Sequence, residues 1–171
     1  MDMGDSAMCT KLTYLDANGR AYHGRTMELG QDYPYQLVYF PAGLTFASQV
    51  KDAAPLNYAT QYSIFAVTMP DRVPTAEAPL VPNDLKVLEG INQAGLSFSL
   101  LAYPWAGGAQ QQRDTTQAIL SVVDLGSWTL GQFQTVDEVK AALAKQPVFV
   151  TPLAVLGGAD APFHYVLTDR T

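Results

Sequence analysis

The chain has 171 residues, of which 48% are hydrophobic and 15% charged, with 10 basic and 16 acidic side chains. This size and composition suffice for one domain with a buried core, and they exclude a disordered tail or a disulfide-stapled miniprotein. The formal net charge of −6 and the lack of any basic run argue against nucleic acid or a membrane surface as a partner, because both are bound through clustered Lys and Arg.

No segment has the length of a membrane span. The longest apolar run, Leu96 to Trp105, is far shorter than the roughly 20 residues that cross a bilayer. The first eight residues contain no apolar core of a secretory signal. We therefore expect a cytoplasmic protein, or a periplasmic one if a signal peptide is removed upstream.

The first half of the chain predicts strands joined by turns. Asn18-Gly19 supplies the positive φ angles that a tight hairpin turn requires. The four prolines between Pro70 and Asn83 each lack a backbone donor, so we expect a long surface loop there. The strands predicted in this half are Thr10 to Leu15, Arg20 to Met27, Leu37 to Phe40 and Tyr62 to Met69.

A second hairpin is predicted around Asn92-Gln93-Ala94-Gly95. Its arms are Leu85 to Ile91 and Leu96 to Tyr103. The second arm is apolar on both faces, which is typical of a strand covered on both sides. We therefore expect this strand to be central in its sheet.

Two helices and two further strands follow. Apolar residues between Thr115 and Leu130 recur at a spacing near 3.6, which predicts a helix. Thr135 and Glu138 have the spacing of a capping box at the start of a helix from Val136 to Lys145. The final strands are expected at Val148 to Leu156 and Phe163 to Thr168. This order predicts an α+β fold in one domain, with a helical layer on a mostly antiparallel sheet.

Cys9 is the single cysteine of the chain. A single thiol cannot form an internal disulfide, and one thiol with two distant histidines does not supply the four ligands of a structural zinc site. We expect no metal or cofactor. A lone cysteine is more often a small buried hydrophobic residue than a nucleophile. However, Met8 precedes it, and removal of Met8 as an initiator would leave Cys9 with a free α-amino group. That amine titrates near 8 and could accept the thiol proton.

Short motifs along the chain resemble the choloylglycine hydrolase family, which contains bile salt hydrolases and penicillin V acylases. Each motif is weak alone, but they occur in the family's order and near its spacing. They are Met8-Cys9-Thr10, Gly24-Arg25-Thr26-Met27-Glu28, Gly90 to Leu96, Trp128 to Gln132, Thr135 to Val139 and Phe163 to Asp169.

This resemblance implies the N-terminal nucleophile (Ntn) hydrolase fold, an αββα sandwich of two antiparallel sheets between helical layers. It identifies residues 9–171 as the N-terminal half of one such domain, so the sandwich is expected to be incomplete in this chain. Residues 1–8 are interpreted as a leader or an expression remnant. The strand and helix predictions are compatible with this fold but do not select it by themselves.

The resemblance also assigns roles to three residues near the N-terminus. Cys9 matches the nucleophile, and Arg25 matches an arginine that stabilises its thiolate. Glu28 falls where the family usually has Asp, a carboxylate that orients the α-amino base. The extra methylene of Glu28 changes the reach of that carboxylate. Without the resemblance, Arg25 would be an outward arginine on an edge strand and Glu28 a solvated carboxylate.

The remaining site assignments concern aromatic residues. Tyr103 matches a position that contributes to the oxyanion hole, where bile salt hydrolases tend to carry Asn and several penicillin V acylases carry Tyr. Tyr33, Tyr35 and Trp105 are candidates for binding an apolar acyl group. Each of these aromatics could instead serve packing alone. The two histidines, His23 and His164, are expected in hydrogen-bonded structural roles.

Two functions follow from these assignments. The first is hydrolysis of linear amides, such as N-acyl compounds or bile-acid conjugates, by an N-terminal cysteine nucleophile without a cofactor. The second is a catalytically inactive binding or assembly domain that retains the fold. The family places a further Asn and Arg of its catalytic set in its second half, and no residue here matches them. An uncovered sheet edge and apolar surface would favour a homo-oligomer.

Overall fold

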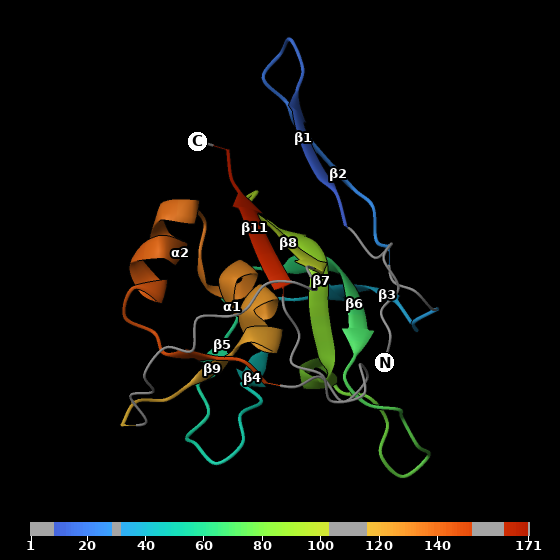
Figure 1. Ribbon diagram of the computed structural model, residues 1–171, viewed down its shortest axis with the longest axis vertical. Helices are drawn as coiled ribbons and strands as arrows, with labels where there is room; N and C mark the ends of the chain where they lie inside the picture. The colour runs from blue at the N-terminus through green and yellow to red at the C-terminus, as the bar shows by residue number, and fades with distance from the viewer. Residues whose placement is uncertain (1–8, 29–31, 103–115, 152–162, 171) are drawn as a thin grey trace.

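A five-stranded sheet forms the centre of the computed structural model, which describes residues 9–28, 32–102, 116–151 and 163–170 (Figure 1). Its strands lie in the order β11-β8-β7-β6-β3, and every neighbouring pair is antiparallel. The bounds are β3 (Gln36–Phe40), β6 (Ile64–Pro70), β7 (Leu85–Asn92), β8 (Ser97–Ala102) and β11 (Phe163–Thr168). Strand β8 was expected to be central; it is an inner strand between β7 and β11, and β7 occupies the middle of the sheet.

Asn92 fixes the turn between β7 and β8. Its side-chain oxygen accepts hydrogen bonds from the amides of Ala94 and Leu96, each at 3.0 Å. Its side-chain nitrogen donates to the carbonyls of Leu130 and Phe133. Gly95 has a φ of +93°, a conformation that favours glycine. The predicted second hairpin is therefore confirmed, and its turn also anchors a neighbouring helix.

The first predicted hairpin is also present. Strands β1 (Lys11–Leu15) and β2 (Ala21–Arg25) pair antiparallel, and Figure 1 shows this hairpin extending away from the rest of the molecule. Asp16 closes the turn by accepting from the amides of Asn18 and Arg20. Gly19 alone among the turn residues takes a positive φ, at +74°, so only one of the two positions in Asn18-Gly19 uses it.

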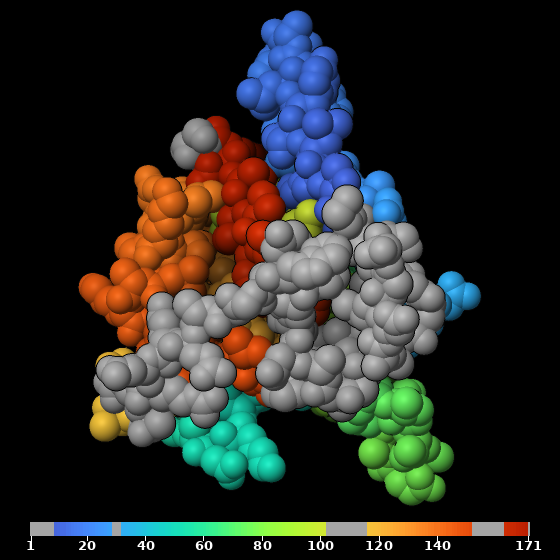
Figure 2. Space-filling model, viewed as in Figure 1, coloured from blue at the N-terminus to red at the C-terminus, as the bar shows by residue number. Residues whose placement is uncertain are grey.

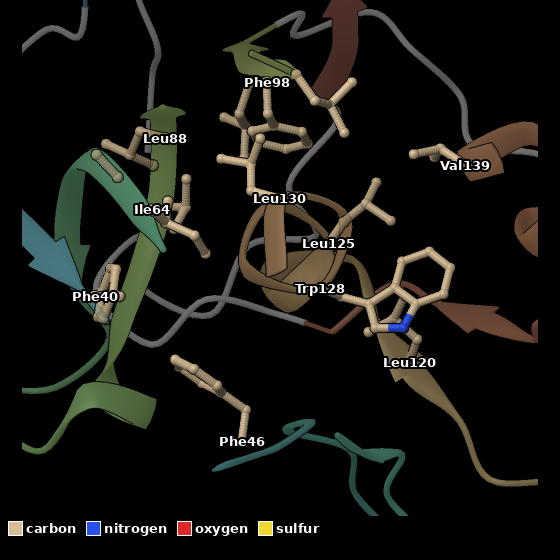
Figure 3. Packing of buried hydrophobic residues seen from close by; sticks show 14 of the residues in the cluster. Phe40, Phe46, Ile64, Leu88, Phe98, Leu120, Leu125, Trp128, Leu130 and Val139 are labelled. Carbon is tan, nitrogen blue, oxygen red and sulfur yellow. The ribbon is translucent and has the colours of Figure 1, made fainter. Parts of the chain in front are cut away.

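Helix α1 (Leu125–Gln132) packs against β7 and β8 at very short range. A Cβ atom at Gly126 would lie 2.8 Å from both Phe98 and Val87, so only glycine fits there. Phe98 and Leu130 are fully buried in the main hydrophobic cluster (Figure 3). The apolar core therefore lies between α1 and one face of the five-stranded sheet.

The predicted start of this helix is wrong. Residues 120–121 form strand β9 (Leu120–Ser121), which pairs in parallel with β10 (Val148–Phe149), and a 3₁₀ turn η2 (Val122–Asp124) follows. The hydroxyl of Ser121 accepts from the amide of Val123 and so caps that turn. Fully buried apolar residues fit a short inner strand as well as a helix, because periodicity does not separate the two.

Helix α2 (Val136–Leu143) begins as predicted and ends two residues earlier than predicted. The hydroxyl of Thr135 accepts from the amide of Glu138, and the Glu138 carboxylate accepts from the amide of Thr135, which completes the capping box. Figure 1 shows α2 on the same side of the molecule as α1.

The connecting segments hold one further sheet and one short turn. Strands β4 (Thr45–Ala47) and β5 (Asn57–Ala59) form an antiparallel pair that the sequence did not predict. The expected loop from Pro70 contains no helix or strand until the 3₁₀ turn η1 (Pro82–Asp84), apart from Pro70 itself, which ends β6.

The two helices in the described part of the chain have eight residues each, and neither could cross a membrane.

Candidate active site

Cys9 is half-buried and lies two residues before β1. The next residue, Thr10, is tied to Thr26: its amide donates to the Thr26 hydroxyl at 3.0 Å, and its carbonyl accepts from the Thr26 amide at 2.9 Å. Lys11 then pairs with Arg25 in the strand register. This local pairing places the cysteine beside the end of β2, where the sequence predicts its catalytic partners.

Arg25 is turned into the molecule, not out toward solvent. Its side chain is 9% exposed, and one terminal nitrogen, Nη1, donates to the carbonyls of Leu100 at 2.8 Å and Leu88 at 3.2 Å. The same nitrogen lies 3.6 Å from a carboxylate oxygen of Glu89. Arg25 therefore joins the β1–β2 hairpin to β7 and β8 through backbone acceptors and a carboxylate.

Tyr33 and Tyr35 lie near this group. Their ring centroids are 6.2 Å apart, and Tyr33 packs against the main hydrophobic cluster while the more exposed Tyr35 does not. Burial raises the pKa of Tyr35, electrostatic interactions with Tyr33 and Cys9 raise it further, and the interaction with Arg25 opposes them. The electrostatic influence of Cys9 and Arg25 on Tyr35 places these three predicted residues in one neighbourhood.

Glu28 is the one other predicted site residue in the described part of the chain. Glu28 is exposed, and no ion pair joins it to any residue in the described part of the chain. Tyr103 and Trp105 lie outside the described residues. The group in the described part of the chain therefore consists of four predicted residues: Cys9, Arg25, Tyr33 and Tyr35.

Lys11, Glu89 and Ser99 are also part of this group, although the sequence analysis did not select them. The Lys11 ammonium donates to the Ser99 hydroxyl at 2.5 Å and lies 3.9 Å from the Glu89 carboxylate. Burial lowers the pKa of Lys11, Glu89 raises it, and Arg25 lowers it. Glu89 directly precedes the Gly90 motif, but its contacts are with the hairpin, more than sixty residues earlier, and no local sequence pattern reports them.

His23 has the hydrogen-bonded role expected of it. Its ring nitrogens lie 3.2 Å from the Thr13 hydroxyl and 3.4 Å from the Thr168 hydroxyl, so it links the hairpin to β11. Burial lowers its pKa, the Lys11 charge lowers it further, and Glu89 raises it. Within the described residues, no group of three or more His, Cys, Asp or Glu side chains could hold a metal ion.

Comparison with known proteins gives one family and a consistent fold. The family model described as linear amide C–N hydrolases, choloylglycine hydrolase family, matches residues 9–171. A conjugated bile acid hydrolase of Lactobacillus gasseri is 24% identical over 163 residues, which are 95% of this chain and 47% of the relative. The chain thus spans about half the length of the curated relatives it matches.

Two solved structures share the fold at low sequence identity. A penicillin V acylase from Agrobacterium tumefaciens superposes with a TM-score of 0.71 and 19% identity, over 94% of this chain and 43% of that one. A variant of the conjugated bile acid hydrolase from Clostridium perfringens, in which a cysteine is replaced by alanine, gives 0.69 and 18%, over 95% and 45%. These likenesses confirm the predicted α+β Ntn-hydrolase fold class, as an incomplete sandwich.

Proposed function

Because the chain belongs to the choloylglycine hydrolase family of linear amide C–N hydrolases, we propose that the whole protein hydrolyses a linear amide with Cys9 as an N-terminal nucleophile. The observation that carries this proposal is that the family match begins at Cys9, the single cysteine of the chain. The buried guanidinium of Arg25 near it supports the proposal, since a fixed positive charge favours a thiolate.

The reaction would proceed in two halves. The free α-amino group of Cys9 accepts the thiol proton, and the sulfur attacks the amide carbonyl to give a tetrahedral oxyanion. The oxyanion collapses, the C–N bond breaks, and the leaving amine takes the proton from the α-ammonium group. Water then loses a proton to the α-amino group and attacks the thioester, which releases the carboxylic acid and restores the thiol.

Supporting roles are proposed for five further residues. Glu28 would orient the α-amino group, a role that requires its exposed carboxylate to come within about 3 Å of the amine. Tyr103 would donate to the oxyanion. Tyr33, Tyr35 and Trp105 would contact the apolar acyl part of the substrate, as aromatic surfaces do in many ligand sites.

The substrate class proposed first is an amide with a flat aryl acyl group, of the penicillin V type. Tyr103 stands where the bile salt branch would have Asn, and an aromatic ring there would narrow the site against a bulky steroid. One such side chain gives on the order of 1–3 kcal/mol of discrimination. The similar proteins include both conjugated bile acid hydrolases and a penicillin V acylase.

A second candidate function is a binding or assembly domain without catalysis. The observation that favours it is a row of large apolar side chains left exposed on neighbouring strands: Tyr39 is 63% exposed, Phe65 51% and Ile91 43%. Surfaces of this kind commonly bind another protein surface. We propose that the 171-residue chain self-associates through it.

Competing hydrolysis of penicillin V and glycocholate tests both candidates. We expect the whole protein to prefer penicillin V, and Cys9→Ser to abolish the activity while Lys51→Ala, at an exposed position, retains it. A clear preference for glycocholate would refute the aryl acyl specificity. Absence of turnover in a monodisperse protein that starts at Cys9 would leave the binding domain as the function.

A further inference from the structure

Glu89 occupies an unusual position under the hairpin that follows Cys9. Its carboxylate lies 3.6 Å from Arg25 and 3.9 Å from Lys11, and the side chain is 23% exposed. One carboxylate oxygen, Oε2, is buried and accepts no hydrogen bond from the described residues. Glu89 therefore meets both cations at ion-pair distance, while its buried Oε2 has no hydrogen-bond donor among the described residues.

The two cations would repel each other without this carboxylate. Lys11 is 5% exposed and Arg25 9% exposed, and the positive charge of Arg25 lowers the pKa of Lys11. Glu89 forms the ion pairs of both within the described part of the chain. Removal of this one carboxylate would leave two like charges buried near each other. A buried charge that loses its partner is strongly destabilising, so both cations depend on Glu89.

The neutral contacts around the group belong to the sheet. The hydroxyl of Ser99 accepts from Lys11, and the carbonyls of Leu88 and Leu100 accept from Arg25. The pKa of His23 also responds to this group: burial lowers it, the Lys11 charge lowers it further, and Glu89 raises it. Glu89 is thus the acidic residue among the groups that hold the hairpin against β7 and β8. The hairpin follows directly on the segment that begins at Cys9.

We propose that Glu89 is a positioning residue for the reaction at Cys9: its carboxylate holds the Arg25 guanidinium and the Lys11 ammonium against the sheet beside the thiol. This inference rests on the proposed function, since it gives Arg25 its role at the nucleophile. It adds a second carboxylate to the site, distinct from the exposed Glu28, and one that acts through Arg25 without touching the substrate.

The test uses the reactivity of Cys9 and needs no turnover. Because Cys9 is the single cysteine, the rate of alkylation by iodoacetamide as a function of pH reports on its thiolate alone. We expect Glu89→Gln to release Arg25 toward solvent and so to slow alkylation at pH 7 about threefold, because the reacting thiolate loses a nearby positive charge. Glu89→Asp, which keeps the charge, should restore part of the rate.

A second variant removes the repulsion itself. In Lys11→Met/Glu89→Gln, Arg25 no longer faces a like charge and keeps its two carbonyl acceptors, so we expect the alkylation profile to return toward that of the unmodified protein. Arg25→Gln gives the reference for complete loss of the guanidinium. If Glu89→Gln does not fold, the alkylation profiles of Glu89→Asp and of the double variant can still be compared with that of Arg25→Gln.

Three outcomes would overturn the proposal. An unchanged profile in folded Glu89→Gln would mean a merely structural role, and faster alkylation would mean that Arg25 stays in place and Glu89 only screens it. A double variant as slow as Glu89→Gln would also contradict the proposal. A failure to hydrolyse any amide, with these shifts intact, would count against the proposed function alone.

Discussion

The two faces of the five-stranded sheet are built in opposite ways. The face toward α1 is closed by apolar side chains packed so tightly that a Cβ at Gly126 or Gly90 would lie 2.8 or 2.9 Å from its neighbours. The other face carries Glu89 and Ser99, paired across β7 and β8, with the hairpin cations above them. The difference separates a face that packs the apolar core from one that holds charged and polar groups.

Strand alternation places the exposed apolar row on this second face. Ile91 lies two residues after Glu89 in β7 and therefore points to the same side. It pairs with Phe65, which pairs in turn with Tyr39. Figure 2 shows the hairpin standing clear of the main body as a separate arm. The face that carries the proposed chemistry is thus polar under the hairpin and apolar beside it.

Removal of one aromatic ring from each face should give the largest difference in stability between the two faces. Phe98 is fully buried against α1, and we expect Phe98→Ala to lower the free energy of unfolding by about 3–5 kcal/mol through lost packing and a cavity. Phe65→Ala, at a side chain 51% exposed on the opposite face, is the matched control, with an expected loss below about 1 kcal/mol. Urea unfolding of both variants measures the difference. Equal losses would contradict the distinction between the faces.

A buried ion cluster at the start of β7 gives the next largest effect. The Lys86 ammonium lies 2.7 Å from Asp124 and 3.5 Å from Asp71, and all three side chains are buried. Lys86→Met leaves two carboxylates without a counter-charge, so we expect a loss of about 3 kcal/mol in the free energy of unfolding. Lys140→Met, which removes an exposed pair with Asp137, should leave stability unchanged in the same urea titration.

The exposed row should affect association more than stability. We expect Phe65→Ser/Ile91→Ser to reduce self-association of the 171-residue chain, because it removes apolar surface that a second molecule would cover. Light scattering across a concentration series measures this change, with Val73→Ser, an exposed apolar residue on the loop after β6, as the control. A protein that is monomeric before the substitutions would refute the proposed association.

The smallest effect concerns pH. The pKa of His23 is lowered in the folded state by burial and by Lys11, so the unfolded chain binds more protons below the ordinary value of 6.5. Stability should therefore fall as the pH falls through 6.5, and His23→Gln should reduce this part of the dependence. Thermal unfolding between pH 7.5 and about 5 checks it. A slope that His23→Gln leaves unchanged would exclude the histidine as its source.

Local patterns predicted the elements whose signals lie within a few residues. The hairpin turns at Gly19 and Gly95 and the capping box at Thr135 are of this kind, and each is present. Long-range contacts account for the rest. The start of α1 depends on the pairing of β9 with β10. The ion pairs of Glu89 depend on Lys11 and Arg25, at the base of the hairpin, so neither feature could be predicted from its own segment.

The site was predicted unevenly for the same reason. Cys9 and Arg25 were selected by motif, and the structure places Cys9 two residues before β1, which pairs with the strand of Arg25. Lys11 and Glu89 belong to no motif and were missed. Arg25 also shows that a strand residue near an edge can be buried by a tertiary contact. The alternation of a two-stranded hairpin gives no information about which of its faces meets the sheet.

The mass of the intact, active protein tests the central proposal most directly. An N-terminal nucleophile requires a free α-amino group on Cys9, so the polypeptide that hydrolyses the amide should begin at Cys9, without residues 1–8. Mass spectrometry of a preparation with measured amide hydrolysis should show that start as the main species. An active preparation that retains Met1 to Met8 would contradict the mechanism, because the amine that accepts the thiol proton would then be part of a peptide bond.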